Sequence, residues 1–319
     1  MNSGETEALE RNRVQRVYQK ILDIDWDPAH GAHPVSVVPV LYEWRNYGKA
    51  RGTLTESIEF VPCIYITNNT FLKLDDGGTE LLARKLLRKL AMERPERIHG
   101  VLLDCDWTER TKERFFRLAQ IMNDSLDMPV SATIRLHQFA RPEATGVPPV
   151  DRGMLMPYNV GQVSAPGDIN SIFNVNAAKP YFEHTAPYPL PLDIAIPAFS
   201  WGAQFRKGRF MGILSEETMD EALTSGLLTG PMEGPFQVKM EDNDHLPQLH
   251  YGDVVRVERM TAELIREVTE LARTAVNNDS TAIAFFELGA TTFQRLDTST
   301  VNSTLNAFGT VRYARTNEP

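Results

Sequence analysis

The chain of 319 residues has few cysteines, an excess of acidic over basic side chains, and no long hydrophobic run. Its only cysteines, Cys63 and Cys105, lie within apolar strand-like runs, which favours a packing role over a disulfide or a nucleophile. The net charge of −9 argues against nucleic acid or an anionic membrane as a partner. No segment reaches the roughly 20 apolar residues that a membrane-spanning helix needs.

Motifs for nucleotides and for most cofactors are also missing. The chain has no P-loop, no G-x-G-x-x-G after a strand and no G-x-S-x-G, so we expect no cofactor. The polar segment 1–16 lacks the apolar core of a signal peptide. The sequence is therefore compatible with two locations. We expect the cytoplasm if Met1 is the native start, and the cell envelope or periplasm if an export signal has been removed.

The chain does contain an alternation of apolar strand-like runs with amphipathic helical segments, which is typical of α/β proteins. Eight runs predict strands: Val17–Asp25, Val35–Leu41, Glu59–Ile66, Ile98–Asp106, Val130–His137, Arg152–Tyr158, Leu190–Phe199 and Thr281–Glu287. Apolar residues at helical spacing predict helices over Thr79–Met92, Arg110–Met122 and Thr261–Val276. Because eight strands close a parallel barrel, we predict a (β/α)8 TIM-type barrel.

The region Phe205–Arg259 departs from this alternation. It is rich in glycine, proline and acidic residues, and its apolar runs are short. We predict an insertion after the seventh strand, near the C-terminal face of the barrel, with a small hairpin or short helices of its own. The whole chain, 1–319, is then a single barrel domain.

Two aspartates end the fourth predicted strand. Asp104 and Asp106 share one face, because residues two apart in a strand point the same way. In a barrel, catalytic residues gather at this carboxyl end of the strands. Two carboxylates on one face repel each other, so one of them would hold a proton near neutral pH, which suits a general acid. The alternative is that Asp106 caps the helix that follows.

Other predicted strands also end in polar or aromatic side chains. The fifth places Ser131, Thr133, Arg135 and His137 on one face. Arg135 and His137 lie nearest its end, whereas Ser131 and Thr133 equally fit a buried hydrogen-bonded network. The remaining candidates for substrate binding or catalysis are Asp25, Glu43, Tyr158, Asn159, Asp193, Trp201 and Glu287. Together they predict a ring of site residues, in which a tryptophan can stack on a sugar ring.

Two of these segments resemble a known family. Gly100–Asp106 is similar to the G-x-D-x-D-x-E strand of the chitinase-like glycoside hydrolases of family 18, and Met156–Asn159 looks like the family's later M-x-Y-D. This resemblance spans residues 98–202 and implies a TIM barrel that cleaves glycans. The runs Leu103–Thr108, Ala132–Gln138 and Tyr188–Asp193 also resemble an uncharacterised bacterial group of glycosidase-like barrel proteins, which implies a fold and no particular activity.

Three acidic positions of the family 18 pattern are changed. Leu102 stands at the first Asp, Asp106 at the Glu that acts as general acid, and Asn159 at the Asp that follows Tyr. Asp104 matches the middle Asp, which in that family helps a substrate acetamido group act as nucleophile. These changes put the substrate-assisted mechanism, and chitin as the substrate, in doubt.

We therefore expect a glycoside hydrolase-like protein whose partner is a carbohydrate. Asp106 would protonate the leaving oxygen, with Asp104, Glu287 or Asp25 as the second carboxylate. The first alternative is a catalytically inactive glycan-binding barrel, which the altered acidic positions suggest. The second is a divalent-metal-dependent hydrolase. We assign no metal ligand, since the seven histidines include no His-x-His pair, although aspartates at adjoining strand ends could bind Mg²⁺ or Ca²⁺.

Overall fold

The structure, a computed structural model, describes residues 3–38, 58–93, 98–165, 167, 170–183, 186–230, 235–239, 246–287 and 296–309. The chain divides into two compact units. Unit 1 comprises residues 1–156, 184–195 and 274–284, and unit 2 comprises residues 157–183, 196–273 and 285–319. The single-domain organisation stays a prediction. None of the helices in the described ranges is long and apolar enough to cross a membrane.

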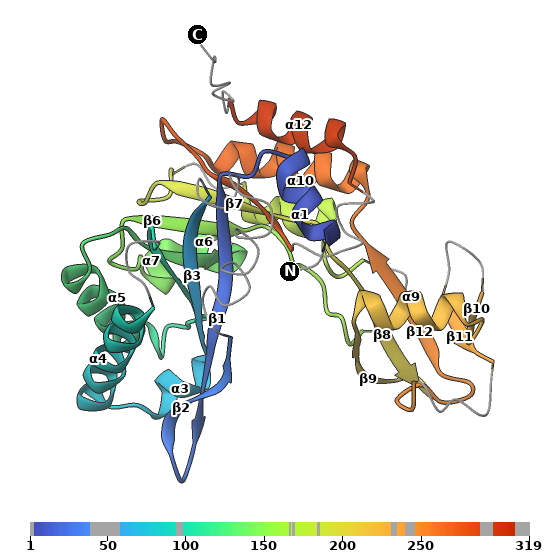
Figure 1. Cartoon of the computed structure of the whole chain (residues 1–319), viewed down its shortest axis with the longest axis horizontal. Helices are drawn as coiled ribbons and strands as arrows, with labels where there is room; N and C mark the ends of the chain where they lie inside the picture. Colours follow the sequence, from blue (N-terminus) through green and yellow to red (C-terminus); the bar gives the residue numbers. More distant parts are fainter. Residues whose placement is uncertain are drawn as a thin grey trace. The chain divides into compact units, whose positions relative to one another are not determined.

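An eight-stranded sheet with the order β13-β7-β6-β5-β4-β3-β1-β2 is the framework of the α/β fold (Figure 1). Its strands are β1 (Arg16–Asp27), β2 (Gly31–Val37), β3 (Glu59–Ile66), β4 (Val101–Asp104), β5 (Val130–Arg135), β6 (Arg152–Met156), β7 (Leu192–Pro197) and β13 (Ile283–Phe286). Neighbouring strands from β1 to β7 pair in parallel. The sequence prediction of an α/β fold built on parallel strands is confirmed.

The second strand differs from its prediction. We expected Val35–Leu41 to be a parallel barrel strand, but β2 ends at Val37 and pairs antiparallel with β1. Only residues 28–30 separate the two strands, which is enough for a hairpin and too short for a parallel crossover. The Asp27 carboxylate closes this turn by accepting hydrogen bonds from the backbone N–H groups of Ala29 and His30.

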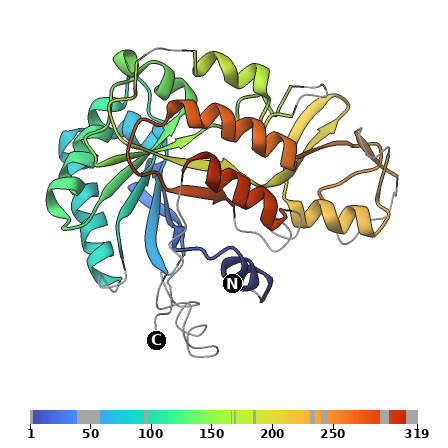
Figure 2. The ribbon, with the colours of Figure 1, turned by 90° about the horizontal axis from the view of Figure 1, so that it is seen from above.

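Helices join the parallel strands of unit 1. They are α3 (Asn68–Lys73), α4 (Asp76–Met92), α5 (Lys112–Ser125), α6 (Leu136–Ala140) and α7 (Pro142–Thr145), and α1 (Ser3–Arg11) precedes β1. The predicted helices Thr79–Met92 and Arg110–Met122 correspond to α4 and α5 and are confirmed. Figure 2 shows α4 and α5, in teal and green, side by side outside the strands.

Unit 2 contains a second sheet, antiparallel and five-stranded, with the order β10-β11-β12-β8-β9. Its strands are β8 (Ser200–Arg206), β9 (Arg209–Leu214), β10 (Leu228–Thr229), β11 (Phe236–Val238) and β12 (Val254–Arg259). This sheet is the insertion predicted after the seventh strand. It begins at Ser200 rather than Phe205, because β8 starts only three residues after the end of β7.

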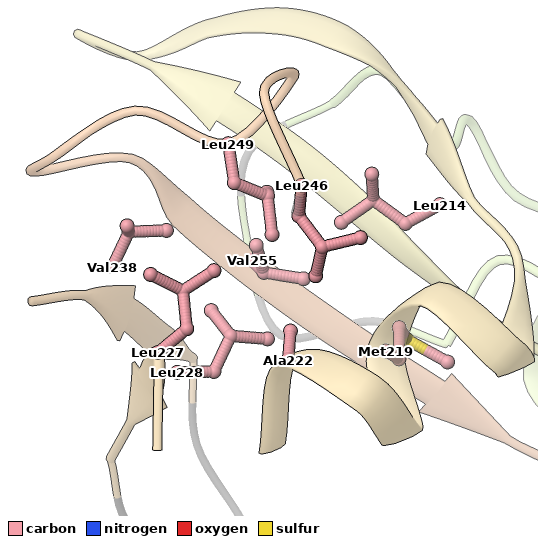
Figure 3. Packing of buried hydrophobic residues seen from close by; sticks show 9 residues of the cluster. All are labelled: Leu214, Met219, Ala222, Leu227, Leu228, Val238, Leu246, Leu249 and Val255. Carbon is pink, nitrogen blue, oxygen red and sulfur yellow. The ribbon is translucent and has the colours of Figure 1, made fainter. Parts of the chain in front are cut away.

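A separate hydrophobic cluster holds the inserted sheet together (Figure 3). Helix α9 (Glu216–Thr224) begins after Ser215, whose hydroxyl accepts a hydrogen bond from the backbone N–H of Thr218. The cluster consists of Leu214, Met219, Ala222, Leu227, Leu228, Val238, Leu246, Leu249 and Val255. Because these side chains come from α9, from the strands and from the loop before β12, the inserted sheet has a core of its own.

The remaining helices of the described chain follow or precede the inserted sheet. They are α8 (Val175–Ala178), the 3₁₀ helix η2 (Lys179–Tyr181), α10 (Ala262–Ala275) and α12 (Thr298–Ala307). Helix α10 confirms the prediction over Thr261–Val276 and buries Ile265, Val268 and Ala272 on one face.

Candidate functional site

The carboxyl end of β4 carries the two aspartates on which the sequence prediction rests. Asp104 is the last residue of β4, and Asp106 follows two positions later. The next residue, Trp107, is completely buried, and its indole Nε1 donates a hydrogen bond to the carbonyl of Thr145 at 3.0 Å. The Trp107 ring also stacks on Phe115 of α5, with centroids 4.9 Å apart. This anchoring fixes the chain just beyond the aspartates.

Asp104 lies in a partly enclosed environment. Thr133 of β5 is fully buried and donates its hydroxyl to Asp104 Oδ1 at 2.7 Å. Burial raises the pKa of Asp104, and the Asp106 carboxylate raises it further, while Arg135 and the Thr133 hydrogen bond act in the opposite direction. The net effect is a raised pKa, so Asp104 keeps its proton to a higher pH than an ordinary aspartate does.

Asp106 has a different environment, because it forms an ion pair with Arg135. The guanidinium Nε of Arg135 donates to Asp106 Oδ1, and 48% of the Asp106 side chain is exposed to solvent. Helix α5 begins only at Lys112, and its N-cap residue is Thr111. The alternative that Asp106 caps this helix is therefore wrong. The two aspartates thus differ: Asp104 is enclosed, whereas Asp106 is exposed and paired with a cation.

Sequence reasoning missed a tyrosine beside this pair. Tyr65 lies on β3 in register with Asp104 of β4. Burial raises the pKa of Tyr65, and the charges of Asp106 and Asp104 add to the rise, so the phenol stays protonated. The sequence did place Tyr65 next to the last residue of a predicted strand. A single aromatic residue at that position does not, however, distinguish a site residue from its neighbours.

Two other predicted residues of unit 1 lie at the same carboxyl edge. Asp25 of β1 accepts hydrogen bonds from the Thr67 hydroxyl at 2.6 Å and from the Trp26 backbone at 2.8 Å, and these bonds lower its pKa. Thr67 is the N-cap of α3, so Asp25 ties β1 to the start of that helix. His137 lies in α6 rather than in the predicted strand, since β5 ends at Arg135. Partial burial lowers its pKa, and the Asp106 carboxylate acts against this.

Asp193 does not join these residues, contrary to its predicted role in substrate binding. It is the second residue of β7 and is 3% exposed. Its carboxylate accepts two hydrogen bonds from Arg152, at 3.1 and 2.7 Å, and one from the backbone N–H of Ala282 at 2.8 Å. Arg152 is the first residue of β6, so this buried ion pair joins the amino ends of the strands, where residues of a barrel serve stability.

The other predicted residues belong to unit 2, except Glu43, which lies outside the described residues. Tyr158 is buried and stacks on Phe286 with centroids 5.8 Å apart. Asn159 is exposed and has a positive φ of 57°. Glu287 is exposed directly after β13. Through Phe199, which contacts both rings, the structure brings Tyr158 and Trp201 into one aromatic cluster.

A buried glutamate, also missed by sequence reasoning, holds Trp201. Glu258 Oε2 accepts hydrogen bonds from Trp201 Nε1 at 3.0 Å and from the backbone and hydroxyl of Ser171, both at 2.6 Å. Its Oε1 pairs with Arg256 at 2.7 Å. The guanidinium of Arg256 also donates to backbone carbonyls of residues 163, 165 and 167. This network therefore ties the inserted sheet to the segment after β6.

Within the ranges that the structure describes, no group of three or more His, Cys, Asp or Glu side chains could hold a metal ion. The residues at the carboxyl edge of unit 1 instead offer three carboxyl groups, a phenol, a guanidinium and an imidazole. Such a set can bind the hydroxyl groups of a polar ligand and can donate or accept a proton.

Comparison with solved structures finds proteins of similar fold. No protein-family model and no curated protein sequence matches it. A chitinase from Chromobacterium violaceum superimposes with a TM-score of 0.56 at 14% identity, over 95% of this chain and 96% of that one. A chitinase from Bacteroides thetaiotaomicron gives a TM-score of 0.56 at 9% identity, over 98% and 96% of the two chains. The spore cortex-lytic enzyme SleL of Bacillus cereus gives a TM-score of 0.51 at 12% identity, over 97% and 71%.

At these identities the comparison shows the fold. The predicted resemblance to glycoside-hydrolase barrels is confirmed at that level, and the chain has the TIM-barrel fold of glycoside hydrolases.

Proposed function

We propose that this protein binds a carbohydrate at the carboxyl edge of the unit 1 strands and cleaves a glycosidic bond with Asp104 and Asp106. The supporting observation is the contrast between the two carboxyl groups, because glycoside hydrolysis needs one acid that carries a proton and a second carboxylate. Burial raises the pKa of Asp104, so Asp104 holds its proton to a higher pH than an ordinary aspartate does. Asp106 is the one of the two that reaches solvent, and therefore substrate.

In this proposal the proton of Asp104 reaches the leaving oxygen through Asp106. The bond between the anomeric carbon and that oxygen breaks, the oxygen takes the proton, and a water molecule adds its hydroxyl to the anomeric carbon. The proton that this water loses returns to Asp104 through Asp106, which restores both carboxyl groups. Arg135 stabilises Asp106 each time it has given up its proton. We assign Asp25 no role in the reaction, because its carboxylate already accepts a hydrogen bond from the Thr67 hydroxyl.

Sugar binding in this proposal uses the polar and aromatic groups near the strand ends. His137 supplies a ring nitrogen next to the carboxyl pair. Unit 2, taken by itself, offers a separate place for a sugar ring to stack, because Glu258 holds the indole of Trp201 in position.

The second candidate is a glycan-binding protein without hydrolytic activity. The ion pair with Arg135 favours it, because this pair engages the one of the two carboxyl groups that reaches solvent. Aspartate in place of the glutamate of the family 18 pattern also shortens the reach of this side chain by one methylene. The aromatic cluster around Trp201 would still serve for binding.

Release of reducing sugar ends from a glycan panel tests the proposal. The solved structures of similar fold are named as chitinases and a spore cortex-lytic enzyme, so the panel includes chito-oligosaccharides and isolated spore cortex. We expect Asp106→Asn to lower kcat by about 100- to 10,000-fold, the usual effect of removing a general acid. Asp124→Asn, the same change at an exposed position of α5, is the control and should leave kcat unchanged.

The outcomes separate the two candidates. Turnover that depends on Asp106 supports the enzyme. Glycan binding without turnover, unaffected by Asp106→Asn, supports the binding protein instead. If no member of the panel is bound or cleaved, both candidate functions are contradicted.

A further inference from the structure

The pairing of β4 with β5 stops short of the ion pair between Asp106 and Arg135. The last two residues in register between these strands are Leu103 and Ala132. Asp106 lies three residues beyond Leu103, and Arg135 lies three residues beyond Ala132. Because the ladder has ended there, hydrogen bonds between the two strands do not set the separation of Asp106 and Arg135.

Gln138 of α6 joins the two main chains beyond the end of this ladder. Its side chain is completely buried. The Oε1 atom accepts a hydrogen bond from the backbone N–H of Arg135 at 2.7 Å. The Nε2 atom donates one to the backbone carbonyl of Trp107, the residue after Asp106, at 3.0 Å. Together with the ion pair, these two bonds form a closed ring of contacts in which the amide links the main chains of both charged partners.

Two further hydrogen bonds hold Gln138 itself. The Thr145 hydroxyl donates to the carbonyl of Gln138 at 3.2 Å, and the Thr145 carbonyl accepts the hydrogen bond of the Trp107 indole. Each of these three residues therefore bonds through its side chain to the main chain of another, and all three are buried. A buried network whose groups are satisfied is rigid, so the Gln138 amide is held in one place.

A glutamine suits this position because the two main chains present opposite groups. Arg135 presents an N–H donor, and Trp107 presents a carbonyl acceptor. A carboxamide has an acceptor and a donor side by side, whereas an ionised carboxylate has no donor for the carbonyl. The bond to Arg135 alone would serve as an N-cap of α6. The bond to Trp107 is not needed for a cap, and it connects the end of β5 to the segment that carries Asp106.

We propose that Gln138 is a positioning residue that sets the separation of Asp106 and Arg135, and thereby the place of the Asp106 carboxyl group at the substrate. Gln138 is completely buried, so it acts through the two residues that it links and not on the substrate itself. The catalytic part of this inference rests on the proposed function, whereas the placement of the ion pair can be measured without a substrate.

Gln138→Met in the full chain tests this role, because methionine has a similar length and makes neither of the two amide hydrogen bonds. The first readout is the titration of Asp104, followed by ¹³C NMR without any glycan. The Arg135 charge lowers the pKa of Asp104 more than the Asp106 charge raises it. When Gln138 no longer holds Arg135, the pKa of Asp104 should therefore rise. With a glycan that the wild type cleaves, kcat should fall by about 100-fold and KM should change by less than about twofold.

Thr79→Val is the matched control for the loss of a buried hydrogen bond in unit 1. Thr79 lies in α4, is completely buried and donates its hydroxyl to the carbonyl of Asp75 at 2.8 Å. We expect this variant to lower Tm by about 1–4 °C and to leave the Asp104 titration and kcat unchanged. Gln138→Met should lower Tm by about 2–8 °C, since it loses two bonds. The comparison separates lost stability from lost positioning.

The Asp104 midpoint decides the inference. A midpoint that rises in Gln138→Met and not in Thr79→Val supports the positioning role. An unchanged midpoint with a lowered Tm overturns it, because Gln138 then only caps α6. If the wild type cleaves no glycan and the midpoint still rises in Gln138→Met, the proposed function fails, while the placement of the ion pair by Gln138 stands.

Gln138→Glu decides if Gln138→Met does not fold. Its protonated carboxyl group can accept from Arg135 and donate to Trp107, whereas its ionised form cannot donate. Its Tm should therefore match that of the wild type near about pH 4 and fall below it as the pH rises through the pKa of the introduced carboxyl group. A difference in Tm that does not change with pH overturns the link between the two main chains.

Discussion

Replacing Arg135 by glutamine removes the guanidinium that pairs with Asp106 and that lowers the pKa of Asp104. Glutamine keeps a polar side chain and carries no charge, so the aspartates lose their nearest positive charge while the local packing changes little. Without the guanidinium, no positive charge next to Asp106 offsets the repulsion between the carboxylates of Asp104 and Asp106. The pKa of Asp104, already raised by burial, should therefore rise further in Arg135→Gln.

The expected loss of stability is small. The pair is partly open to solvent, since 48% of the Asp106 side chain and 20% of the Arg135 side chain are exposed. Solvent screening limits such pairs to about 0.5–1 kcal/mol. For a chain of this size, that loss lowers Tm by about 1–4 °C. The difference between wild type and Arg135→Gln should shrink in about 1 M salt, where exposed charges are screened over a few ångströms.

The titration of the aspartate carboxyl carbons, followed by ¹³C NMR, measures the main effect, and Asp104→Asn assigns the resonance. The folded-state pKa of Asp104 lies above its ordinary value of 3.8, so its contribution to stability is fully present below that value and is lost as pH rises through the folded-state pKa. In Arg135→Gln, the pH range in which protonated Asp104 contributes to stability should extend to higher pH. If cleavage is detected, the alkaline limb of kcat/KM moves the same way. An Asp104 midpoint that stays in place or falls would refute the arrangement described here.

Three further substitutions test other contacts. Thr133→Val removes the hydroxyl that donates to Asp104, so the pKa of Asp104 should rise and the free energy of unfolding should fall by about 1 kcal/mol, as measured by ¹³C NMR and urea denaturation. Gly153→Ala places a Cβ atom 2.9 Å from side chains of both neighbouring strands, and overpacking should cost about 1–3 kcal/mol in the same denaturation assay. Glu258→Gln leaves Arg256 buried without its carboxylate and should cost about 3–5 kcal/mol by thermal unfolding; an unchanged Tm contradicts that network.

The sequence by itself determined most of the local structure. The strand Glu59–Ile66 was predicted with the bounds of β3, because a short apolar run between polar segments has few other solutions. The helices α4 and α5 followed from the spacing of their leucines and phenylalanines, which repeats with the period of a helix. Asp104 was predicted at the carboxyl end of a strand, which the structure confirms, whereas Asp106 lies beyond the end of β4 and not within the strand as predicted. These features depend on residues that are close together along the chain, and local sequence carries that information.

Only the tertiary structure decided which of these residues meet. Asp106 and Arg135 are 29 positions apart and form a pair because β4 and β5 are neighbours in the sheet. Tyr65 joins them because β3 lies on the other side of β4. Asp193, whose residue type resembles that of the other candidates, lies at the amino ends of the strands and pairs with Arg152. Strand order, register and strand direction follow from the packing of the whole chain, and no local pattern in the sequence specifies them.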